Sequence, residues 1–232
     1  MIVLGIETAT TVCASAVVVD GSVAAEAMLD RRNVHAEKLL TLVDEVLRRS
    51  GRKLGAVDGI AVSIGPGSFT GLRIGLSVAK GLAYAVGGAL IAVPTLEALV
   101  SRIEFHGPPS RTDLVVPMLD ARRDEVYCQF FVWRGEQLLP EGDARDLTLS
   151  EMVMQAGTRT VTVIGDAHRK LAGFLEHLSA EDRQRFRFIE GTASQCSAVS
   201  VALIGERLLK EGRRDDPATL EPRYIKEFFL AR

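Results

Sequence analysis

A predicted helix with almost no polar side most constrains how this chain can fold, because such a helix must be buried over most of its surface. It follows a glycine-proline turn and is expected over residues 70–86. One apolar stripe at helical spacing contains Ile74, Val78, Leu82 and Ala85, and a second, rotated from it, contains Leu72, Leu76, Ala79 and Ala83. One stripe can pack on the chain's own sheet. The other needs a further cover, and a partner subunit is a candidate for it.

Glycines within the same segment indicate close packing. Gly71, Gly75 and Gly81 each weaken a helix by about 1 kcal/mol relative to alanine. A glycine also lets another backbone approach closely. The pattern therefore favours close contact over intrinsic helix stability.

The length and the net charge limit the classes of protein to which this chain can belong. The 232 residues suffice for one large domain or two lobes with a sizeable core. The formal net charge of −2 provides no global basic field, so a role with RNA would depend on a partner's surface or on a local patch. Cys13, Cys128 and Cys196 are widely spaced and odd in number, which indicates a reducing compartment and no zinc or disulfide framework.

No targeting or membrane signal is visible in the sequence. The first residues lack the basic region and cleavage site of a signal peptide. No apolar run is long enough to span a bilayer. We therefore expect a soluble, cytoplasmic protein that does not associate with membranes.

The order of strand and helix patterns predicts two similar α/β lobes. A three-strand meander followed by helix, strand and helix fills residues 1–105. A shorter series of the same kind fills residues 106–232, after a linker expected at 106–110. Each lobe is expected to be a mixed sheet with helices on its faces. The pattern leaves open whether the last helix, residues 197–210, packs back on the first lobe.

Two turns have the composition of phosphate-binding loops, and each also has a purely structural interpretation. The loop of residues 4–11 carries Thr8 and Thr10, whose hydroxyls can bind a phosphate or can satisfy the turn's own backbone. Residues 65–68 can form an anion-binding nest, or a tight turn capped by Ser68 or Thr70. The Gly-Lys-Ser/Thr ending of a P-loop is missing.

Three further motifs also allow more than one interpretation. Residues 120–125 carry two arginines that can hold a phosphate or a tRNA backbone, or can form a charged hairpin tip in water. Gly165 ends a predicted strand before a helix, a geometry that can receive an adenosine. His35 and Glu37 are two positions apart at a helix start, so they face different sides and form no metal site.

Taken together, five segments resemble the bacterial TsaB (YeaZ) family of tRNA threonylcarbamoyladenosine biosynthesis proteins. They are Gly-Ile-Glu-Thr at 5–8, Asn-Val-His-Ala-Glu-Lys-Leu-Leu at 33–40, Gly-Pro-Gly-Ser-Phe-Thr-Gly-Leu-Arg-Ile-Gly at 65–75, Asp-Ala-Arg at 120–122 and Glu-Pro-Arg-Tyr at 221–224. The resemblance is strong over residues 1–130 and continues, more weakly, to the end.

The resemblance implies an α/β fold of two ribonuclease-H-like lobes, as in the acetate and sugar kinase, heat-shock chaperone and actin superfamily. It implies a role in adding threonylcarbamoyl to the adenosine next to the anticodon of ANN-decoding tRNAs. In that family the catalyst is the paralogue TsaD, which binds a metal and transfers the threonylcarbamoyl group. TsaB forms a heterodimer with TsaD, and the ATPase TsaE joins the pair.

This chain fits the non-catalytic paralogue, because residues 93–99 lack both histidines of the His-x-x-x-His motif by which TsaD binds its metal. The resemblance therefore implies no catalytic residue, no metal and no cofactor of the chain's own, with ATP placed only at the interface of the complex. It also implies a homodimer through the same face when TsaD is absent. The residues assigned to the partner interface are His35, Leu39, Ser68, Phe69, Leu72, Arg73, Leu76, Ser77, Ala79, Lys80, Ala83 and Tyr84.

Two other functions remain as alternatives. An independent ATPase or small-molecule kinase of the same fold would bind ATP·Mg through Thr8, Thr10 and Gly165. Glu7 counts against it, because an aspartate usually stands at that position in such enzymes and the longer side chain would displace a magnesium ion. A metallopeptidase is the third hypothesis.

Overall fold

A computed structural model describes the backbone of residues 1–106 and 113–226 and the side chains of 1–103 and 113–226. The chain forms two compact units. Unit 1 contains Met1–Ala98 and Cys196–Arg223, and unit 2 contains Leu99–Gln195 together with residues 224–226. Most of the linker predicted at 106–110 lies outside the described residues.

Unit 1 is built on a five-stranded sheet with the strand order β3-β2-β1-β4-β5. The strands are β1 (Ile2–Glu7), β2 (Val12–Val19), β3 (Ser22–Asp30), β4 (Gly59–Ser63) and β5 (Ala89–Val93). The first three form an antiparallel meander, while β4 and β5 run parallel to β1. Since β1 and β4 are buried along almost their whole length, their continuous apolar runs match central strands covered on both faces.

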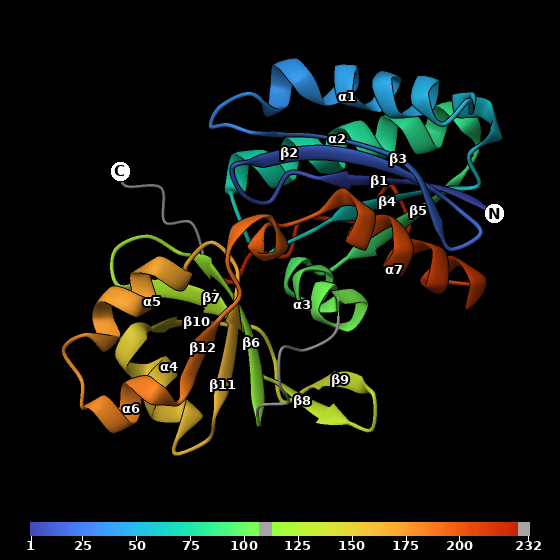
Figure 1. The fold of residues 1–232 in the computed structure, drawn as a ribbon. Coiled ribbons are helices and arrows are strands. Elements are labelled where there is room, and N and C mark those ends of the chain that lie inside the picture. Colours follow the sequence, from blue (N-terminus) through green and yellow to red (C-terminus); the bar gives the residue numbers. More distant parts are fainter. Residues whose placement is uncertain (107–112, 227–232) are drawn as a thin grey trace. The chain divides into compact units, whose positions relative to one another are not determined.

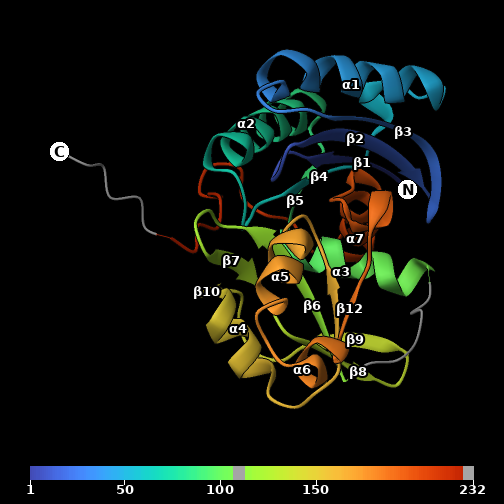
Figure 2. The ribbon, with the colours of Figure 1, turned by 60° about the vertical axis from the view of Figure 1, so that its left-hand side comes forward.

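Helices cover both faces of this sheet. α1 (His35–Arg49) and α2 (Phe69–Val86) lie on one face, and α7 (Ala198–Lys210) lies on the other (Figure 1; Figure 2). α7 lies directly on the strands because Gly205 has no side chain: a Cβ there would stand 2.3 Å from Cβ of Ala61. A short 3₁₀ helix, Leu54–Ala56, precedes β4, and α3 (Thr95–His106) carries the chain from unit 1 into unit 2.

Unit 2 contains a second sheet with the order β10-β7-β6-β11-β12, and β8 pairs with both β6 and β9. Its strands are β6 (Leu114–Asp120), β7 (Glu125–Cys128), β8 (Phe131–Arg134), β9 (Gln137–Pro140), β10 (Arg145–Thr148), β11 (Val161–Ile164) and β12 (Phe186–Phe188). Its helices are α4 (Leu149–Ala156), α5 (His168–Leu175), α6 (Ala180–Gln184) and the 3₁₀ helix Gly191–Ser194. α4 and α5 pack their apolar side chains into the main core of this unit.

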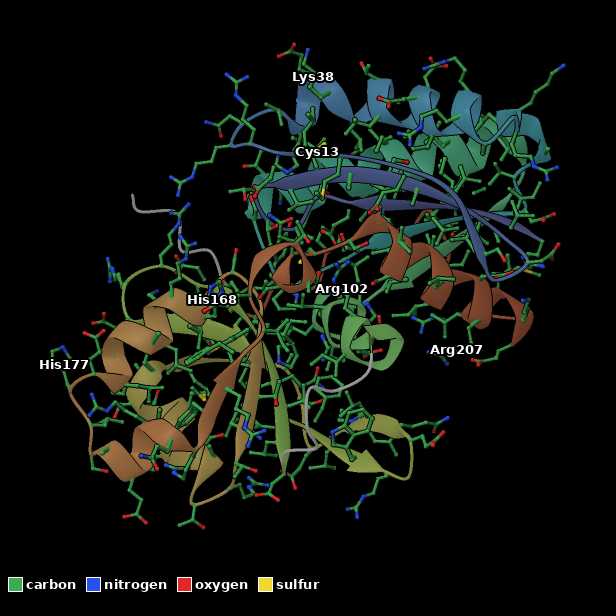
Figure 3. All side chains as sticks on the ribbon, viewed as in Figure 1. Cys13, Lys38, Arg102, His168, His177 and Arg207 are labelled. Carbon is green, nitrogen blue, oxygen red and sulfur yellow. The ribbon has the colours of Figure 1, made fainter. Side chains whose placement is uncertain are left out.

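Side-chain hydrogen bonds to the backbone fix the ends of several elements in unit 2. Thr148 and Glu151 form a capping box at the start of α4. Arg102 of α3, labelled in Figure 3, donates from Nε to the carbonyl of Ala193 at 2.9 Å. This bond ties α3 to the 3₁₀ helix Gly191–Ser194.

The boundaries of the two compact units differ from the single boundary expected between residues 105 and 106. Residues 99–106 belong to unit 2, and Cys196–Arg223 returns to unit 1. The return has a clear physical cause, because Val201 and Ala202 of α7 are fully buried in one cluster with Val3 of β1. The last long helix thus closes the second face of the first sheet.

Candidate functional site

The 18-residue helix α2 carries the candidate site, and its two ends are well defined. The hydroxyl of Ser68 caps the start by accepting a hydrogen bond from the Gly71 N–H at 3.3 Å. Gly87, with a left-handed φ of 63°, ends the helix. The turn at 65–68 is thus capped by Ser68, as one of the two interpretations of this segment predicts.

One side of α2 belongs to the core of unit 1. Leu72, Leu76, Ala79 and Ala83 are at most 4% exposed. Gly71 and Gly75 lie against Thr8, since a Cβ at these positions would stand 2.1 Å from the Thr8 carbonyl oxygen and from Thr8 Oγ1, respectively. These two glycines therefore make room for the turn at Thr8 in the same unit, and not for the backbone of a partner. Gly81 has open space where its Cβ would be.

The opposite side of α2 is a surface. Ser68, Arg73, Ser77 and Tyr84 are exposed, and Phe69 and Lys80 are half-buried. The Tyr84 ring is 90% exposed, more than any other large hydrophobic side chain that the structure describes. We call these six residues the outer α2 face. Its first turn is ordered by the Arg73 guanidinium, which stacks 3.9 Å from the centre of the Phe69 ring.

The remaining six residues assigned to a partner interface do not reach this surface. His35 is buried at the start of α1, with its Nε2 at 3.2 Å from the Val12 carbonyl oxygen. Leu39, Leu76, Ala79 and Ala83 pack in the core of unit 1, and Leu72 is fully buried. These six residues support α1 and α2 from inside, because each is at most 7% exposed. Figure 3 shows the contrast near the start of α1, where Lys38 extends outward while Cys13 of β2 lies inside.

The other apolar stripe of α2 is partly covered by the chain itself. Ile74, Val78 and Leu82 are half-buried against the core of unit 1, and Ala85 is exposed. The need for an external cover is thus smaller than the sequence pattern indicates.

The residues considered for a nucleotide mostly serve the chain's own structure. The Thr10 hydroxyl accepts a hydrogen bond from the Val12 N–H at 3.2 Å, as the structural interpretation of this loop predicts. Gly165 lies in unit 2, where its N–H donates to Ser194 Oγ at 2.7 Å. A Cβ on Gly165 would stand 2.0 Å from the Met118 carbonyl oxygen, so close packing explains this glycine. Thr8 is fully buried, and its hydroxyl has no hydrogen-bond partner among the described residues.

Glu7 is a fully buried carboxyl group beside the Thr8 turn. Its Oε1 accepts hydrogen bonds from the Ala9 N–H at 2.6 Å and from Ser63 Oγ at 2.9 Å, while Oε2 has no partner among the described residues. Burial raises the pKa of Glu7 to about 7, although the hydrogen bonds from Ala9 and Ser63 act in the opposite direction. Near neutral pH this loop therefore holds a carboxyl group that is protonated about half of the time.

The described residues contain neither a metal-binding cluster nor a membrane-spanning helix. Among the side chains of 1–103 and 113–226 there is no group of three or more His, Cys, Asp and Glu residues placed to hold a metal ion. None of the helices in the described part of the chain has both the length and the apolarity that crossing a bilayer requires.

Comparisons with known proteins agree with this architecture. The family model of TsaD, tRNA N6-adenosine threonylcarbamoyltransferase, matches residues 22–188. The chain is 34% identical to the Escherichia coli tRNA threonylcarbamoyladenosine biosynthesis protein TsaB over 169 residues, which cover 70% of this chain and 71% of that protein.

Solved structures show the same relationship. A Pseudomonas aeruginosa protein described as similar to the peptidase YeaZ superposes with a TM-score of 0.78 at 25% identity, over 97% of this chain and 99% of that one. A ROK hexokinase from Thermus thermophilus superposes with a TM-score of 0.51 at 14% identity, over 91% of this chain and all of the other, which shows a shared fold alone. The mixed α/β architecture with two sheets is therefore a fold that this chain shares with the YeaZ structure and with the hexokinase.

Proposed function

The chain belongs to the TsaB family of tRNA threonylcarbamoyladenosine biosynthesis proteins, and on that premise we propose that it is a non-catalytic scaffold subunit of this modification. In this proposal it forms a heterodimer with TsaD, which performs the transfer to the adenosine next to the anticodon. The ATPase TsaE joins the pair, and tRNA is bound by the assembled complex. When TsaD is absent, the same face supports a homodimer.

The outer α2 face is the observation that supports a protein partner. Tyrosine and arginine are enriched among residues that dominate interface energies, because each offers a large, rigid contact area with a polar end. Tyr84 stands almost fully in solvent, and Arg73 is held over Phe69. Ser77 and Gly81 are small, so a helix from another subunit can approach α2 closely between them.

We also propose that the chain takes no nucleotide of its own and that ATP binds, if at all, at the interface of the complex. The contacts of Thr10 and Gly165 support this, because their polar groups are already bound within their own units. The cytoplasm is the compartment we propose. Cys13, Cys128 and Cys196 are buried and form no disulfide, a pattern typical of proteins from reducing environments.

A charge placed on the outer α2 face tests the heterodimer. Ser77→Arg inserts a long cation where the helices would meet, and a charge buried without a partner strongly weakens an interface. We expect the affinity for TsaD, measured by calorimetry, to fall about tenfold or more. The melting temperature of the isolated chain should stay within about 1 °C, because Ser77 is exposed.

Met154→Arg provides the matched control. Met154 is also on a helix, is 73% exposed and belongs to unit 2, so the same charge is added away from α2. This variant should bind TsaD as the unaltered chain does. Equal affinities for Ser77→Arg and Met154→Arg would show that the outer α2 face is not the interface.

A further inference from the structure

Arg122 and Arg123, at the turn between β6 and β7, both adopt the left-handed backbone conformation, with φ of 70° and 47°. In the described chain, the other non-glycine residues with positive φ are Asp20 and Asn33, and these two residue types tolerate that conformation best. Consecutive left-handed residues at a hairpin turn are usually Asn or Gly. The arginines thus hold a conformation that costs energy, which indicates that their side chains serve a purpose other than forming the turn.

Three carboxylates near this turn, those of Asp120, Glu125 and Asp146, already pair with lysines. Asp120 Oδ1 lies 2.7 Å from Lys170 Nζ and also accepts the backbone N–H of Arg122 at 2.8 Å. Glu125 forms an ion pair with Lys226, whose Nζ is also 3.7 Å from Asp146 Oδ2.

Both arginine side chains are exposed. Within the described residues neither forms an ion pair or a side-chain hydrogen bond. Two exposed guanidinium groups at adjacent chain positions of this hairpin therefore remain available for an external anion.

We propose that Arg122 and Arg123 bind the phosphate groups of the tRNA backbone; this inference rests on the proposed role in tRNA modification. The planar guanidinium offers paired N–H donors that match the oxygens of a phosphate. Contacts of this kind position an RNA without reading its sequence. Since the net charge of −2 provides no overall positive field, any contact that this chain itself makes with RNA needs a local basic patch such as this one.

The turn geometry allows a test in which stability and binding change in opposite directions. The double variant Arg122→Asn, Arg123→Gly removes both charges and installs residues that favour the left-handed conformation. We expect its melting temperature to rise by a few degrees, on the order of that for other turn optimisations. Its affinity for unmodified tRNA, measured on the full chain mixed with TsaD, should fall about tenfold.

The salt dependence of the affinity provides a second readout. Loss of two phosphate contacts should reduce the slope of log K against log salt by about 1.5. Arg134→Gln is the matched control, since Arg134 is exposed at the end of β8 in the same unit. It should leave both the affinity and the slope unchanged.

Two outcomes would overturn the inference. One is an unchanged affinity and slope in the double variant. The other is a variant that binds tRNA normally but assembles poorly with TsaD, which would identify an acidic protein surface as the partner of the arginines. Reconstitution of the modification without this chain tests the proposed function separately. If the chain is necessary there but the double variant still binds tRNA normally, only the inference about the arginines fails. If modification proceeds without the chain, the proposed function fails whatever the double variant does.

Discussion

Glu7 shows how a single residue can make the first unit sensitive to pH. Its side chain is fully buried beside Ser63 and Thr8, and burial raises its pKa from 4.5 to about 7. Below pH 4.5 the carboxyl is protonated in both the folded and the unfolded chain. Between pH 4.5 and 7 the unfolded chain loses this proton while the folded chain keeps it. The free energy of unfolding must therefore fall as the pH rises through this window.

Glu7→Gln removes this dependence while keeping a group that accepts the Ala9 N–H. In urea unfolding at pH 5, 6, 7 and 8, we expect the unaltered chain to lose about 3 kcal/mol more than the variant between pH 5 and 8. Glu37→Gln is the control, because Glu37 is exposed and its pKa is lowered by Lys38. Parallel pH profiles for the Glu7→Gln variant and the unaltered chain would show that Glu7 is not a buried titrating group.

At the scale of the element, neighbouring residues of α2 should differ sharply in their contribution to stability. Leu76 is 4% exposed in the core, whereas Ser77 is exposed. Leu76→Ala should lower the free energy of unfolding by about 3 kcal/mol, because it removes buried methyl groups and leaves a cavity. Ser77→Ala should change it by less than about 0.5 kcal/mol. Denaturant melts of both variants test this, and equal losses would mean that the orientation of α2 is wrong.

The orientation of α2 is also where inference from the sequence reached its limit. Two apolar stripes with the same helical spacing carry no information about which one faces the sheet. Of the residues assigned to the partner interface, Arg73, Ser77 and Tyr84 are exposed on α2, whereas Leu72, Leu76, Ala79 and Ala83 are buried. Gly71 and Gly75 interact with Thr8, a contact between residues more than sixty positions apart that no local pattern reveals.

Most elements of the fold follow from local patterns, and the exceptions are short or depend on distant pairing. α2 and α7 lie within one residue of the helices expected over 70–86 and 197–210. Between residues 125 and 134 the chain forms two short strands, β7 and β8, because β7 pairs with β10 while β8 pairs with β9. β10, α6 and β12 were not predicted, since three to five residues carry too little periodicity.

At the scale of the whole molecule, the second face of the first sheet is covered by a helix from near the end of the chain. α7 contacts β1, β2, β4 and β5, although about a hundred residues separate it from the last of these strands. Sequence patterns identified the helix but left its packing open, because an apolar stripe does not specify which sheet it covers. The division into two units is thus a property of tertiary packing and not of chain order.

As a scaffold, this chain would be required for the modification without performing the chemistry. The most direct test of this role is reconstitution by omission: unmodified tRNA, a source of threonylcarbamoyl-adenylate, TsaD and TsaE are combined with and without this protein. The tRNA nucleosides are then read by mass spectrometry. The scaffold account predicts modified adenosine only when the chain is present. Equal modification in its absence would contradict the account and would favour an independent ATPase or kinase of the same fold.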